Sequence, residues 1–304
     1  MEFGKIGEGF ARVQIDSVAI AVAVAALVLI ISSIRWWIFV RAANFPHGLG
    51  VAVRVRLIAQ LLNLIIPSGV VGDGLQVFLV SRRPRLSGPK ALATILVDRL
   101  VALFTVALLL FMTAWLLGDE MADLVYSVIL AVGFAVFVFA LGVLLSRKLD
   151  WMQLPAGRLS SILKFVTGTF QEIGAFKNAF TSLTLALILA VIGILGTTAI
   201  AWFLMSGMVE VSFLQLLPTF CLVMLSSFVP ATFSGLGVRE WIFFANLKAF
   251  GMSLEESVAL SLTLFGVLAF TAAILSIASA AIAAYKGEST TWLRSIFLKR
   301  RQDA

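Results

Sequence analysis

Five long apolar segments limit what this chain can fold into more than any other feature of its sequence. A helix needs about 20 apolar residues to cross the hydrocarbon core of a bilayer. Hydrophobic residues make up 61% of the 304 residues and charged residues only 13%, a composition that water-soluble domains of this size do not have. We therefore predict an all-α fold, a polytopic membrane helical bundle. The expected spans lie near Ser17–Val40, Ala91–Leu117, Ala122–Ser146, Phe180–Met205 and Glu256–Tyr285.

Charged loops between the spans predict how the chain is oriented in the membrane. The 23 Lys and Arg residues outnumber the 16 Asp and Glu residues, but they are dispersed between spans, so we expect no nucleic-acid partner. Basic residues gather in cytoplasmic loops of membrane proteins. Four, four, five and five of them fall in residues 35–56, 82–90, 147–177 and 286–301, respectively. These stretches are predicted to be cytoplasmic.

Three other connections carry acidic residues and no Lys or Arg, and we predict that they face the exterior. They are Gly118–Asp123, Ser206–Val211 and Ser253–Ser257. The sequence therefore predicts a multi-pass protein of the cell (inner, cytoplasmic) membrane with its C-terminus in the cytoplasm.

Two shorter apolar stretches are interrupted by proline and glycine. They read NLIIPSGVVGDGLQVFL (residues 63–79) and SSFVPATFSGLGVREWI (residues 226–242). Proline removes a backbone donor and glycine loosens a helix, so each stretch is predicted to form two half-helices joined at a tip. The expected first half-helix, Leu57–Ile66, would be about 15 Å long. The stretches align at an offset of 163, which pairs the predicted tip residues Pro67 with Pro230, Gly72 with Gly235 and Gly74 with Gly237.

The loop charges also predict the side from which each interrupted stretch enters the membrane. Both loops around Leu57–Val80 are basic, so this stretch is expected to enter and leave from the cytoplasm. Both loops around Phe213–Phe250 are acidic or neutral, so that stretch is expected to dip in from the exterior. We predict an inverted-topology repeat with two re-entrant helical hairpins, an arrangement known from secondary transporters.

We predict one integral membrane domain over residues 1–304. The first half of the repeat covers about residues 17–117 and the second about 180–286. Between them lie a linking span at 122–146 and an amphipathic helix at 157–177. The last segment is a basic cytoplasmic tail at 287–304.

Five charged residues remain after the loops are assigned: Asp73, Asp98, Arg99, Arg239 and Glu240. A charge near the bilayer centre is costly unless it is paired or hydrated, so these residues are the candidates for headgroup binding. Two helix N-termini at the tips, together with Arg99 and Arg239, would form an anion site. The structural alternative is that the acids cap helices and the remaining charges only join helices. One His and one Cys form no metal-ligand cluster, so we expect no metal and no cofactor.

At these residues the sequence resembles the transmembrane region of lysylphosphatidylglycerol synthases, a flippase-like family of integral membrane proteins. The resemblance lies in IRWWIFV at residues 34–40, in the stretch from Pro67 to Asp73, in VDRL at 97–100 and most specifically in GLGVRE at 235–240. It implies a protein that moves a lipid, or a lipid-linked headgroup, between leaflets. Members tend to carry an Arg in the helix after the second hairpin, whereas this chain has SLTLFGVLAF at 261–270. This departure argues against a two-arginine clamp on that helix.

Two functions remain open from the sequence. The first is a transporter for an anionic lipid, with phospholipids or polyprenyl-type lipids as partners and alternating access as the mechanism. The alternative is a membrane-embedded component of a lipid-modifying system, with a soluble lipid-modifying enzyme or a second copy of the chain as partner. An enzyme is not expected, because the chain has no long polar segment, no Ser-His-Asp set and no phosphate-binding Gly-Lys loop.

Overall fold

A computed structural model describes residues 9–45, 48–65, 71–81, 87–117, 158–226 and 237–286, and residues 7 and 133. All regular structure in these segments is helical. Four helices are long and apolar enough to cross a membrane, which confirms an all-α, polytopic membrane bundle. They are α2 (Ile15–Ala42), α5 (Gly88–Leu117), α8 (Ala179–Met205) and α11 (Leu254–Tyr285).

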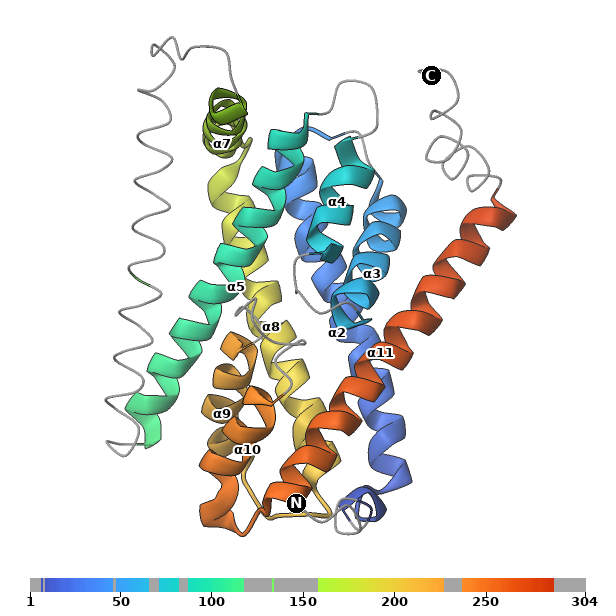
Figure 1. Cartoon of the computed structure of the whole chain (residues 1–304), viewed down its shortest axis with the longest axis vertical. Coiled ribbons are helices and arrows are strands. Elements are labelled where there is room, and N and C mark those ends of the chain that lie inside the picture. Colours follow the sequence, from blue (N-terminus) through green and yellow to red (C-terminus); the bar gives the residue numbers. More distant parts are fainter. Residues whose placement is uncertain are drawn as a thin grey trace.

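Shorter helices occupy the interrupted stretches and the segment before α8. In each interrupted stretch two helices pack against each other, α3 on α4 and α9 on α10. Figure 1 places the first pair in one half of the long molecule and the second pair in the other half. Their bounds are α3 (Leu49–Ile65), α4 (Val71–Ser81), α9 (Phe213–Ser226) and α10 (Val238–Leu247), with a 3-10 turn η2 (Lys248–Phe250) after α10 and α7 (Arg158–Gly174) before α8.

The helices of the two halves follow the same order at nearly constant spacing. Helices α2, α3, α4 and α5 begin at residues 15, 49, 71 and 88, and α8, α9, α10 and α11 begin at 179, 213, 238 and 254. Corresponding helices run in opposite directions in Figure 1: α2 and α11 toward the end that carries α7, α8 and α5 away from it. The inverted repeat and the re-entrant hairpins stay predictions, which this order and these directions favour.

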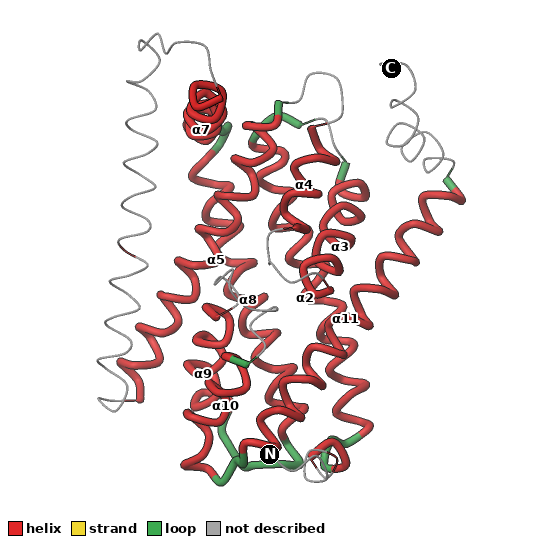
Figure 2. Tube along the Cα trace, viewed as in Figure 1, coloured by secondary structure: helices red, strands yellow, loops and turns green. Residues whose placement is uncertain are grey.

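The two ends of the molecule differ in charge. One end carries α7, the start of α5 and the last turn of α11 (Figure 2), and we call it the basic end because Lys164, Lys90 and Lys286 lie on or directly after these elements. The opposite end carries the α8–α9 connection and the start of α11, which hold the acidic loops. Helix α7 is seen end-on in Figure 1, so its axis lies across the long axis of the bundle. This orientation suits a helix on a bilayer surface.

Two details of the first interrupted stretch correct the sequence prediction. Helix α3 has 17 residues and is therefore about 25 Å long at 1.5 Å per residue, longer than the half-helix expected at Leu57–Ile66. Helix α4 already begins at Val71, so Gly72 and Gly74 lie in its first turn and not in an irregular tip. Three predicted tip residues, Pro67, Pro230 and Gly235, lie outside the described residues. So do the linking span 122–146, apart from residue 133, and the tail 287–304.

Helices α2 and α8 form the central pair of the bundle and approach closely. Hydrophobic burial drives helix association little in lipid, so small residues that allow close packing take its place. Ala21, Ala25 and Ala190 are fully buried. A Cβ atom at Gly196 would come within 2.6 Å of Val28 Cγ2, so any larger residue there would require the Val28 side chain to shift. Helix α3 packs against α2, and helix α9 packs against α8.

Candidate functional site

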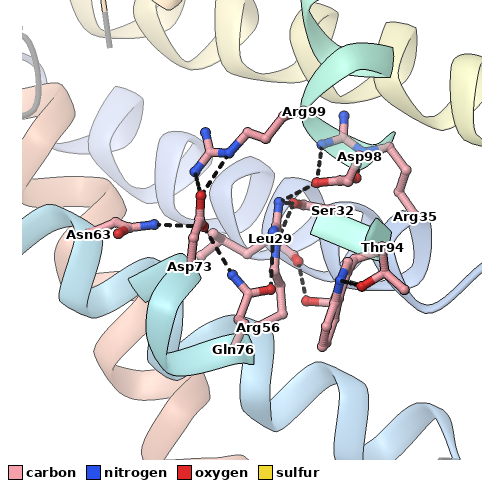
Figure 3. Close-up of polar contacts among 12 residues, drawn as sticks. Leu29, Ser32, Arg35, Arg56, Asn63, Asp73, Gln76, Thr94, Asp98 and Arg99 are labelled. Atoms are coloured by element: carbon pink, nitrogen blue, oxygen red, sulfur yellow. Dashed lines mark hydrogen bonds and ion pairs between the residues drawn. The ribbon is translucent and has the colours of Figure 1, made fainter. Parts of the chain in front are cut away.

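A buried carboxylate joins three helices of the first half. Asp98 on α5 is 0% exposed and accepts hydrogen bonds from Arg35 Nε on α2 at 2.7 Å and from Arg56 Nη2 on α3 at 2.9 Å. Figure 3 shows both guanidinium groups turned toward it. Ser32 Oγ accepts two further bonds from Arg56 at 3.3 and 3.4 Å. A buried ion pair offsets the free-energy cost of its desolvation only when further hydrogen bonds satisfy its charged groups.

The same group of polar side chains continues to α4. Arg56 Nη1 donates to Gln76 Oε1 at 3.3 Å, and Gln76 Nε2 donates to Asp73 Oδ1 at 3.2 Å. Arg99 on α5 donates to Asp73 Oδ2 through Nη2 at 2.7 Å and through Nε at 3.0 Å. Arg35, Asp98, Arg56, Gln76, Asp73 and Arg99 thus form one connected chain of bonds (Figure 3), which we call the first polar cluster.

Gly72 and Asn63 set the position of Asp73. The Gly72 N–H donates to Asn63 Oδ1 at 2.8 Å, which satisfies one of the free N–H groups in the first turn of α4. A Cβ atom on Gly72 would lie 2.0 Å from the Ala59 carbonyl oxygen, so this contact requires glycine. Asp73 then stands in the first helical turn, where the helix dipole favours a carboxylate.

A smaller polar cluster lies at the start of α10 and is called the second polar cluster. Arg239 Nε donates to Ser261 Oγ on α11, and the Ser261 hydroxyl donates to Glu240 Oε1. The Gly237 N–H donates to Glu240 Oε2, which caps the helix. Gly237 has φ +88°, a conformation that glycine adopts without strain.

One donor of the second polar cluster is left without a hydrogen bond. Arg239 is only 7% exposed, and its Nη2 atom has no hydrogen-bond partner among the described residues. Its nearest anion is Glu240 Oε1 at 3.6 Å, and its guanidinium carbon lies 5.9 Å from the Phe265 ring centroid. A buried donor without a bond is costly, so this atom suits an additional acceptor.

The two clusters share part of their positions in the two halves. At the offset of 163 that relates the interrupted stretches, six polar positions in or beside the first cluster meet another polar residue, and all six counterparts are buried, whereas Ser32, Asp73 and Arg99 meet leucines. The pairs are Arg35 with Thr198, Arg56 with Thr219, Asn63 with Ser226, Gln76 with Arg239, Thr94 with Ser257, and Asp98 with Ser261. The halves therefore share a pattern of buried polar positions, although the first half carries more charge.

The five residues proposed from the sequence fall into these two clusters. Asp73, Asp98 and Arg99 belong to the first, and Arg239 and Glu240 to the second. Asp98 and Arg99 are neighbours in sequence but lie about 100° apart around α5, so they bond to different partners. We predicted that the starts of α4 and α10 form a single anion site, and this stays a prediction.

Sequence reasoning missed three residues of the clusters. Arg35 and Arg56 were counted as loop cations, but they lie inside α2 and α3 and bind Asp98. Ser261 was taken as part of a departure from the family pattern, yet it joins Arg239 to Glu240. A comparison of the polar residues in the two halves at the offset of 163 would have identified these three residues.

Comparison with known proteins gives one match. The model of the family described as lysylphosphatidylglycerol synthase TM region matches residues 1–295 of this chain. No curated protein and no solved structure matches it significantly.

Neutralising Asp98 tests the central carboxylate. Asp98→Asn leaves the buried Arg56 and the partly buried Arg35 without their anion. Breaking a buried ion pair costs about 3–5 kcal/mol, so the midpoint of thermal unfolding in detergent should fall clearly. Asp16→Asn is the matched control, since Asp16 is exposed on α2. Adding Arg56→Gln to Asp98→Asn should restore part of the loss. Equal stability of Asp98→Asn and Asp16→Asn would contradict this assignment.

Gly72 and Gly74 provide a second matched pair. Gly72→Ala forces α4 away from α3, because its Cβ meets a backbone oxygen, and overpacking of this kind costs about 1–3 kcal/mol. A Cβ on Gly74 has nothing within 4 Å, and alanine favours a helix, so Gly74→Ala should be neutral or stabilising. Thermal unfolding of both variants in the same detergent measures the difference. If both variants unfold alike, the packing of α4 on α3 is not as described.

Proposed function

Because the chain belongs to the lysylphosphatidylglycerol synthase transmembrane-region family, we propose that it is a flippase-like transporter that moves an anionic lipid, or a lipid-linked headgroup, between leaflets. Alternating access is the proposed mechanism. The observation that carries the proposal is the pair of polar clusters, one in each half, which share several buried polar positions within an apolar bundle.

The charge of the first polar cluster favours an anionic substrate. Its three arginines, Arg35, Arg56 and Arg99, face two carboxylates, Asp73 and Asp98, so one positive charge is in excess. A charge inside a membrane is retained at high cost, usually for function. Arginine also binds phosphate oxygens through two parallel hydrogen bonds. A phosphate-bearing headgroup would balance the excess.

Exposure within the cluster points to the residues that would meet the headgroup. The side chain of Asp98 is 1% exposed, whereas those of Asp73 and Arg99 are 15% and 33% exposed. We assign the Arg35–Asp98–Arg56 part to holding helices together and the Asp73–Arg99 part to contact with the substrate. In the second polar cluster the Nη2 atom of Arg239 supplies the corresponding donor.

Helix polarity supports the same substrate class. Helices α4 and α10 both begin at their inner ends and run toward opposite ends of the molecule (Figure 1). The first turn of a helix carries partial positive charge, which attracts anions. Symmetric placement of two such ends around the middle of a bundle is what alternating access through an inverted repeat requires.

Transport can be measured with a fluorescent phosphatidylglycerol in proteoliposomes. Purified protein should accelerate movement of this lipid between leaflets, and Arg99→Gln and Arg239→Gln should each slow it about tenfold or more, the effect of losing a charged hydrogen bond. Lys248→Gln, an exposed residue at the opposite end from α7, should leave the rate unchanged.

Two results would contradict the proposal. One is a rate that neither arginine substitution changes in folded protein. The other is equal acceleration of fluorescent phosphatidylcholine, because a zwitterionic headgroup carries no net charge for the cluster to balance. Thermal unfolding of each variant in detergent separates a loss of transport from a loss of fold.

A further inference from the structure

An apolar groove lies on the flank of the bundle near the basic end. It encloses a cavity of about 440 Å³ between α5 and α8, with the residues that join α7 to α8 at its upper edge. Phe39, Val97 and Val101 form a buried floor. Phe104 and Leu183 form exposed rims, 49% and 42% accessible.

The lining of the groove is almost entirely apolar. Only two of its lining residues, Ser182 and Thr184, carry polar side-chain atoms, and the Thr184 hydroxyl already donates to the Phe180 carbonyl of its own helix at 3.0 Å. Apolar cavities of about 150 Å³ bind benzene, so this larger one suits a longer hydrocarbon. A polar ligand would lose its hydration there without gaining bonds.

Two lysines stand between the groove and the basic end. Lys90 precedes Val97 by seven residues on α5, which places it on the same face and about 10 Å closer to the basic end. Its Nζ lies 5.6 Å from the Phe45 ring centroid, and Phe45 belongs to the hydrophobic cluster against which Phe176 of the groove packs. Lys177, exposed, follows Phe176, and its N–H donates to the Ala42 carbonyl at 3.0 Å.

We propose that this groove binds one acyl chain of an anionic phospholipid from the leaflet at the basic end, with the lipid phosphate on Lys90 and Lys177. The spacing fits, because charged groups sit at headgroup level and the groove begins about 10 Å deeper, inside the hydrocarbon core. Basic residues beside an apolar surface are the usual recognition elements for anionic lipids. This lipid is held in place and not moved, so the proposal stands independently of transport.

Photocrosslinking of full-length protein in phosphatidylcholine vesicles tests this site. The probe is a phosphatidylglycerol with a diazirine in its acyl chain, and crosslinked peptides are identified by mass spectrometry. Crosslinks should concentrate on residues 97–104 and 179–187. Leu183→Trp should fill the groove and remove most of them, whereas Leu185→Trp should not, because Leu185 is exposed on the same helix but does not line the groove.

The headgroup part of the proposal has its own readout. Unlabelled phosphatidylglycerol should compete with the probe better than phosphatidylcholine, and Lys90→Gln and Lys177→Gln should each weaken this competition about fivefold. Lys248→Gln is the matched control. Equal competition by both lipids would overturn the anionic assignment, and equal crosslinking along all lipid-facing helices would reveal surrounding bilayer lipid only. Absence of crosslinks in the groove would overturn the proposal. The transport assay decides none of these outcomes.

Discussion

The carboxylate of Asp98 is the interaction on which the first half of the molecule depends. It lies at the centre of α5 with no exposure and holds an arginine from α2 and another from α3. Through Arg56 the same group reaches Gln76 on α4. Four helices are thereby fixed to one anion in a medium that offers little hydrophobic force for packing them. The desolvation of these charges is offset because Asp98 accepts bonds from two arginines and Arg56 donates to three partners.

The cluster around Asp98 explains how a short hairpin helix can be held inside an apolar bundle. Helix α4 has only 11 residues and is stabilised at its start by Asn63, by close packing at Gly72 and by the Asp73–Arg99 pair. The second half carries fewer charges at the corresponding positions, so that Ser261 replaces Asp98 and two threonines replace the two arginines. Its distinctive feature is the Arg239 Nη2 atom, which lies 3.6 Å from Glu240 Oε1 and has no hydrogen bond within the described part of the chain.

Much of the fold was predictable because membrane spans are set by hydropathy and length. The four described spans, their order and the all-α class follow from apolar runs that need no tertiary information. The start of α4 was predicted wrongly, because glycine next to aspartate normally indicates a loop, whereas here the missing side chain of Gly72 permits contact with α3. Arg35 and Arg56 were misplaced for another reason: counting charges along the sequence ignores which helix face they occupy, and only the fold shows both facing Asp98.

The central claim is that the first interrupted stretch begins and ends on one side of the membrane and the second on the other. Single cysteines at Asn44, Ser87, Glu210 and Ala249, in a Cys221→Ser background, would be labelled in sealed right-side-out and inside-out vesicles. All four positions are exposed. We expect Asn44→Cys and Ser87→Cys to be labelled from the cytoplasmic side, and Glu210→Cys and Ala249→Cys to be labelled from the exterior. Labelling of Asn44→Cys and Ser87→Cys from opposite sides would contradict it, because α3 and α4 would then cross the bilayer as an ordinary span.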